Sequence, residues 1–82
     1  MPTLPDGLTE ADIADALMDL AHRRGADKSF CPSEVARGLS PDWRSLMPMI
    51  RHIAATLPLK ATQRGAPVDP VEARGPIRLS LR

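Results

Sequence analysis

Aromatic side chains are nearly absent from this sequence of 82 residues. Tyrosine is missing, and Phe30 and Trp43 are the only phenylalanine and tryptophan. Proteins that bind single-stranded nucleic acid without sequence preference stack bases on aromatic side chains, so the composition argues against that class. Because 43% of the residues are nonetheless hydrophobic, the core must be packed from aliphatic side chains, with Trp43 as an expected anchor.

Cysteine and histidine are also scarce. Cys31 is the single cysteine and has no partner for an intramolecular disulfide, and two histidines, His22 and His52, are too few for a paired zinc motif. We therefore expect no metal and no cofactor. A glycine-rich phosphate loop, a nucleophile elbow and a paired-carboxylate motif are lacking as well, so we do not expect an enzyme.

Long apolar runs are missing too. A membrane-spanning helix needs about 18 consecutive apolar residues, and no hydrophobic stretch here approaches that length. Residues 1–7 carry two prolines and an aspartate but no apolar segment of the kind found in secretion signals. Together with the single cysteine, these absences predict a cytoplasmic protein without membrane contact.

Charged residues are plentiful, but they are unevenly distributed. Residues 1–42 contain four basic and eight acidic side chains, whereas residues 43–82 contain seven basic and two acidic ones. The net charge of +1 therefore conceals an acidic N-terminal half and a basic C-terminal half. An asymmetry of this kind indicates an anionic partner for the basic half.

Capping signals and apolar spacing predict two helices in the acidic half. Thr9 followed by Asp12 resembles a capping box, and the apolar residues after it recur at helical spacing until Gly25. We therefore expect a helix over residues 10–24. A short second helix is predicted from Pro32, because proline suits the first helical position.

A third helix is indicated by a stripe of apolar residues at positions 43, 46, 47, 50, 53, 54 and 57. Pro48 interrupts this stripe, and proline in a helix interior removes a backbone hydrogen bond. Either the helix kinks there or a separate turn precedes it. We favour Pro48 as the first residue of the main helix, which would end near Leu57, and Ser40 with Pro41 as a capped start just before it.

The C-terminal part of the chain predicts an antiparallel hairpin. Residues 59–64 alternate loosely between apolar and polar, and residues 77–82 alternate strictly, with outward-facing Arg78, Ser80 and Arg82. The segment between them is rich in glycine and proline, which predicts a long flexible tip rather than a tight turn. Residues 29–31 are compatible with a further, very short strand.

Three helices followed by a hairpin form the element order of a winged helix-turn-helix, an α+β fold with a small antiparallel wing. A chain of this length has room for one hydrophobic core. We therefore expect residues 9–82 to form a single winged-helix domain, preceded by a flexible N-terminus at residues 1–8.

Three blocks of sequence resemble one known family. They read CPSEVAR at residues 31–37, WRSLMPMIR at residues 43–51 and RGPIRL at residues 74–79. From about Ile13 to Leu81 the chain resembles small bacterial proteins grouped as domain of unknown function 3253. The resemblance implies a winged-helix-like fold. It implies no activity, because the family has none established and its motif residues have no assigned roles.

The basic half of the chain predicts the functional surface. In helix-turn-helix proteins the second helix of the motif enters the major groove and the wing contacts the backbone. The outward side of the third helix and the outward side of the hairpin are both basic here. We therefore predict duplex DNA as the partner, bound by Arg44, Arg51, His52, Lys60, Arg64, Arg74, Arg78 and Arg82.

Protein docking or homodimerisation is the alternative, because winged helices also serve as interaction modules. The contact would then be the acidic side of the first helix or an exposed Met49. Arg44 has two possible partners: it could bind a phosphate, or it could pair with a carboxylate such as that of Glu34 or Asp42.

Overall fold

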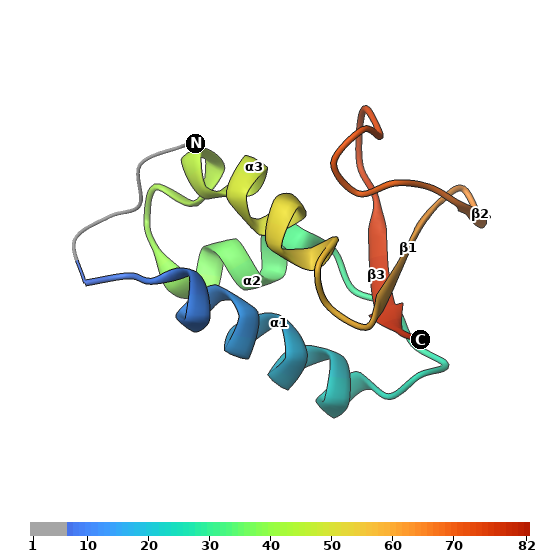
Figure 1. Ribbon diagram of the computed structural model, residues 1–82, viewed down its shortest axis with the longest axis horizontal. Helices are drawn as coiled ribbons and strands as arrows, with labels where there is room; N and C mark the ends of the chain where they lie inside the picture. The colour runs from blue at the N-terminus through green and yellow to red at the C-terminus, as the bar shows by residue number, and fades with distance from the viewer. Residues whose placement is uncertain (1–6) are drawn as a thin grey trace.

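The computed structural model describes residues 7–82, which form three helices followed by three strands (Figure 1). These elements are α1 (Glu10–Arg24), α2 (Pro32–Leu39), α3 (Trp43–Ala54), β1 (Leu59–Gln63), β2 (Ala66–Pro67) and β3 (Arg78–Leu81). The flexible N-terminus predicted at residues 1–8 lies outside the described residues except for its last two, of which Leu8 packs against the core.

Helix α1 has the predicted bounds and the predicted cap. Thr9 Oγ1 accepts a hydrogen bond from the Asp12 amide at 3.1 Å, and Asp12 Oδ2 accepts one from the Thr9 amide at 2.9 Å. Ile13 and Leu17 are completely buried on the inner side of the helix. The helix ends at Gly25, whose φ of 85° is disfavoured for any other residue.

Helix α2 begins as predicted, with Pro32 in its first turn and Cys31 as the N-cap. Glu34 reaches back and accepts a hydrogen bond from the Cys31 amide at 2.9 Å, which satisfies a donor that the helix leaves unpaired. Val35 and Ala36 are buried on the inner side. The two helices α2 and α3 are separated by a turn of three residues, as a helix-turn-helix requires.

Helix α3 corrects the prediction for Pro48. It starts at Trp43 with Asp42 as the N-cap, so Pro48 lies inside a continuous helix, and Ser40 with Pro41 precede it. The proline is tolerated because its side chain is exposed, so the carbonyl that loses its partner lies on the solvent side of the helix. The helix also ends at Ala54, earlier than the predicted Leu57.

The sheet contains three antiparallel strands in the order β2-β1-β3, where two strands were predicted. The additional strand β2 arises because residues 64 and 65 form a tight turn that pairs Gln63 with Ala66. Arg64 and Gly65 have φ values of 53° and 83°, and two positive φ angles are what a two-residue hairpin turn needs. The glycine and proline content of the expected long tip concealed this turn.

Strand β3 joins the sheet to the helices. It pairs with β1 on one side, and Leu79 forms an isolated bridge with Phe30 on the other, where the amide of each donates to the carbonyl of the other at 2.8 Å. This bridge replaces the short strand predicted at residues 29–31. Because β3 is flanked on both sides and contacts α1, Ser80 is only 6% exposed, whereas the alternation had predicted an outward residue.

The elements are arranged as a winged helix-turn-helix, the predicted α+β fold. Figure 1 shows α1 along one edge of the molecule and α3 along the opposite edge, with the wing of β1, β2 and β3 beyond the end of α3. Ile13, Phe30, Ile50 and Leu79 meet in the core between them. Trp43 contributes less than predicted, because its ring is half-buried at the rim of the core. No helix within residues 7–82 has the length and apolarity to cross a membrane.

Candidate functional site

Helix α3 presents one side to solvent and buries the other. Leu46, Ile50 and Ile53 hold the buried side against the other helices. The exposed side carries Arg44, Ser45, Pro48, His52 and Ala55. Met49, which the docking hypothesis placed at the surface, is 2% exposed and belongs to the core. The exposed side therefore combines a basic residue and a histidine with small side chains that permit close approach of a partner.

Arg51 does not extend freely from this side. Its side chain is half-buried, and its guanidinium donates to the carbonyl oxygens of Ala73 and Gly75 at 2.7 and 2.6 Å. These two charge-assisted hydrogen bonds fasten α3 to the loop that precedes β3. Arg51 thus shapes the surface on which it was predicted to act.

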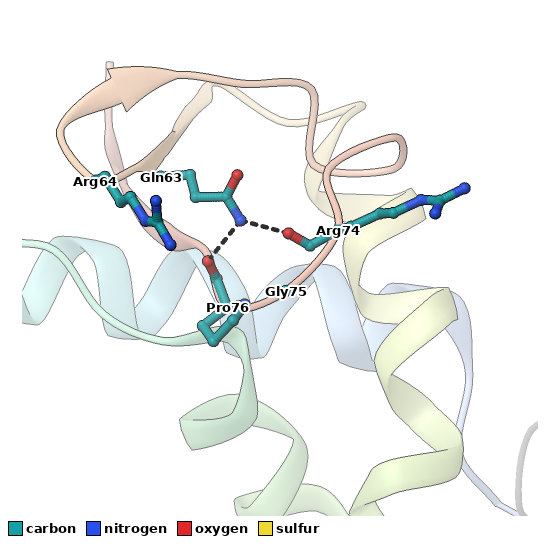
Figure 2. A pocket seen from close by; sticks show the side chains of 5 residues that line it. All are labelled: Gln63, Arg64, Arg74, Gly75 and Pro76. Atoms are coloured by element: carbon teal, nitrogen blue, oxygen red, sulfur yellow. Dashed lines mark hydrogen bonds between the residues drawn. The ribbon is translucent and has the colours of Figure 1, made fainter.

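Gln63 fastens the same loop from the side of β1. Its Nε2 donates to the carbonyl oxygens of Arg74 and Pro76, the second at 3.2 Å (Figure 2). Together with Arg51, it occupies four successive carbonyl oxygens, those of residues 73–76. Sequence analysis did not identify Gln63, because a polar residue at the end of a strand carries no signal of a distant partner.

Arg78 and Arg82 also contact the protein itself. Arg78 Nε donates to Ser29 Oγ at 3.0 Å and its Nη2 to the Ser29 carbonyl at 2.9 Å. Arg82 Nε donates to the Leu59 carbonyl at 3.0 Å. Both side chains remain exposed, so part of each guanidinium still faces solvent.

The remaining predicted cations of the wing, Lys60, Arg64 and Arg74, are exposed. An open cleft of about 540 Å³ lies between the tight turn and the loop, lined by Gln63, Arg64, Arg74, Gly75 and Pro76. Figure 2 shows the Arg64 side chain beside this cleft and the Arg74 side chain directed away from it. The two guanidiniums therefore diverge and do not form a common anion pocket.

Arg44 pairs with neither carboxylate considered for it. Its guanidinium carbon lies over the Trp43 ring, 4.5 Å from the centroid, and that of Arg37 lies over the same ring at 4.6 Å. Glu34 instead accepts from Arg24 at 2.6 Å, and Asp42 accepts from the Ser45 hydroxyl. Arg37 was not among the predicted site residues.

The ion pairs are distributed as unevenly as the charges and lie in the acidic half of the chain. Within residues 7–82 there are two of them, Arg23 with Asp19 and Arg24 with Glu34, and both belong to α1 and α2. None of the seven cations at residues 43–82 takes part in an ion pair with a described residue. The acidic half of the protein thus neutralises some of its own charge, whereas the basic half retains its charge.

The titration of Glu34 is perturbed by its hydrogen-bond partners. The hydrogen bond from the Cys31 amide and that from the Arg24 guanidinium hold the pKa of its carboxyl below the ordinary value, and the nearby charges of Arg24 and Arg78 act in the same direction. Because Glu34 is already engaged by these partners, its role is to hold α1 and α2 together.

Metal-ligating side chains do not gather in the described part of the chain, where no group of three or more His, Cys, Asp or Glu could hold an ion. Asp12 is occupied by the helix cap and Asp19 by Arg23. Cys31 Sγ is half-buried and lies 3.0 Å from the Ser33 hydroxyl. These side chains thus have structural partners.

A family model described as "Protein of unknown function (DUF3253)" matches residues 10–82. The chain belongs to this family. The match spans all three helices and the sheet, which confirms the resemblance carried by the three sequence blocks. A search of the curated proteins found no match. Because the DUF3253 description names no activity, the function of this DUF3253 domain has to be argued from its surface.

Proposed function

We propose that this DUF3253 domain binds duplex DNA, with the exposed side of α3 and the outer side of the wing as its contact surface. The observation that supports it most directly is the distribution of ion pairs. Both pairs found within residues 7–82 lie on α1 and α2, whereas the exposed cations of α3 and the wing have no carboxylate partner there. A cationic surface of this kind gains free energy when a polyanion covers it and counterions are released.

The residues have different roles in this proposal. Arg44, Lys60, Arg64 and Arg74 are exposed and would contact phosphates, and His52 is exposed on α3. Arg51, Arg78 and Arg82 are occupied by protein oxygens, so they would mainly hold the wing in place: Arg51 at the loop, Arg78 at Ser29 and Arg82 at Leu59.

The proposal also covers the cellular compartment of the protein and whether it is an enzyme. The compartment proposed for DNA binding is the cytoplasm, and binding to DNA requires no catalytic group. We accordingly propose a non-enzymatic, cytoplasmic protein that needs no metal or cofactor.

Fluorescence anisotropy with labelled duplex DNA of random sequence tests the proposal. We expect binding at micromolar protein with a strong salt dependence, because each neutralised phosphate adds about −0.9 to the slope of log affinity against log salt. Lys60→Gln, Arg64→Gln and Arg74→Gln should each weaken binding and reduce the slope by about one unit.

Lys28→Gln is the matched control, because it removes the same charge from an exposed loop residue between α1 and α2. It should leave the slope unchanged. The absence of salt-sensitive binding, or equal effects of the control and the wing variants, would contradict DNA binding. Docking to a protein or to a second copy of the chain would then be favoured, and sedimentation would reveal a homodimer.

A further inference from the structure

Two arginines converge on one ring at the start of α3. Arg37 lies in the last turn of α2, and Trp43 is the first residue of α3 with Arg44 directly after it. Both guanidinium carbons lie within 4.6 Å of the centroid of the Trp43 ring. The three residues form a cluster that the three-residue turn between α2 and α3 brings together, although Arg37 and Trp43 are six positions apart.

The chemistry of this cluster suits phosphate groups. A guanidinium that lies over an indole face is held by the cation–π interaction while its N–H groups remain available to an oxyanion. Arg37 and Arg44 are exposed, and neither forms an ion pair with a described residue. The neighbouring Asp42 carboxylate accepts from Ser45 instead. Both guanidiniums therefore carry positive charge that no described carboxylate neutralises, and a polyanion beside them would supply that neutralisation.

The cluster and the wing lie at opposite ends of α3. The wing follows the C-terminal end of α3, whereas the cluster lies at its N-terminal end, about 18 Å away along a helix of 12 residues (Figure 1). A duplex that lies along the exposed side of α3 would therefore meet cations at both ends of the helix. The phosphates of the DNA backbone form a regularly spaced row of anions, which suits cations that lie at both ends of one helix.

We propose that Arg37, Trp43 and Arg44 form a clamp for backbone phosphates of duplex DNA. This inference rests on the DNA binding proposed above, and it adds α2 to the contact surface through Arg37. Because the clamp contacts phosphate and not base edges, it contributes affinity that is independent of sequence.

Trp43 itself reports on the clamp, because it is the only tryptophan of the protein. Duplex DNA is titrated into the full chain while Trp43 emission is followed with red-edge excitation, and anisotropy of labelled DNA is measured in parallel. We expect a salt-sensitive change in Trp43 emission with the same midpoint as the anisotropy. Replacing chloride by inorganic phosphate at equal ionic strength should leave the emission unchanged, because a single small anion gains little from the clamp.

Arg37→Gln and Arg44→Gln should each weaken DNA binding about fivefold to tenfold at 0.1 M salt, and the double variant should reduce the salt slope by about two units. Lys28→Gln is again the matched control and should change neither readout. The affinity loss should be the same for unrelated DNA sequences.

The outcomes separate the two proposals. If labelled DNA binds and the wing variants weaken it, while Trp43 emission stays constant and Arg37→Gln binds like the control, the clamp is wrong and DNA binding stands. If the unaltered protein shows no salt-sensitive binding at all, both proposals are wrong. If inorganic phosphate alone changes Trp43 emission as DNA does, the cluster is a site for small anions and the assignment to DNA is wrong.

Discussion

Arg51 on α3 and Gln63 on β1 hold the same four-residue loop through alternate carbonyl oxygens. Arg51 binds those of residues 73 and 75, and Gln63 binds those of residues 74 and 76. The helix and the wing are therefore connected through side chains as well as through the backbone. This connection sets where Arg74 and the cleft beside Arg64 lie relative to the exposed side of α3 (Figure 2).

Arg51→Ala should lower the free energy of unfolding by about 1–3 kcal/mol, because two carbonyl oxygens lose a charged donor. Urea denaturation measures this change. Arg74→Ala is the control: its side chain is exposed and has no partner in a described residue, so the change should stay within about 0.5 kcal/mol. Equal effects of the two variants would show that the hydrogen bonds of Arg51 to the loop contribute nothing to stability.

Gln63→Ala should act on the same loop as Arg51→Ala. The two side chains do not bond each other, yet each depends on the loop staying where the other holds it. A double-mutant cycle should therefore show a coupling of about 0.5–1 kcal/mol in the free energy of unfolding. Strict additivity would mean that the two anchors act independently.

Pro48→Ala should stabilise the protein. Position 48 lies inside α3 and faces solvent, so alanine restores a helical hydrogen bond without disturbing the core. We expect a gain of about 1–3 kcal/mol, which raises Tm by several degrees. Calorimetry measures the shift. A lower Tm would mean that the backbone around Pro48 is shaped for the proline.

Arg64→Asn should raise stability and lower DNA affinity at once. Arg64 has a φ of 53°, which asparagine adopts more easily, so the tight turn should gain about 0.5–1 kcal/mol. The same change removes an exposed cation from the proposed contact surface. Thermal unfolding and DNA anisotropy measured on one preparation check both effects. A variant that is more stable and binds DNA as before would show that Arg64 is not part of the DNA-contact surface.

Glu34 should contribute to acid unfolding. Its pKa in the folded protein is lowered, first by the hydrogen bond from the Cys31 amide and then by Arg24. The resulting stability is complete above the ordinary glutamate pKa, and it is lost as the pH falls through the lowered value. Glu34→Gln keeps a capping oxygen but removes the charge, so stability measured against pH should fall less steeply on the acid side. An unchanged acid slope would contradict this assignment.

Much of the fold followed from local signals. The cap of α1, the proline that opens α2 and the strands β1 and β3 were predicted because each depends on residues close together in the chain. The prediction for Pro48 was wrong because packing of the buried side of α3 outweighs one lost hydrogen bond. The strand β2 was missed because a turn with Arg64 in its first position lacks the usual sequence signal.

The candidate surface was less predictable. Charge patterning indicated which half of the chain is basic, and every predicted cation except Arg51 is exposed. Patterning did not reveal that Arg51, Arg78 and Arg82 bind protein oxygens, because their partners lie 22 to 49 positions away. Arg37 was overlooked for a different reason: Trp43 is only six positions away, but the two residues meet only through the turn between α2 and α3.

The sequence alone determined the element order, the caps and the division of charge, because these depend on neighbouring residues and on composition. Only the tertiary structure decided which cations hold the wing and which remain exposed to a partner. A guanidinium donates to water or to a carbonyl oxygen depending on which groups the fold places near it. For Arg51 the fold places the loop at residues 73–76 there.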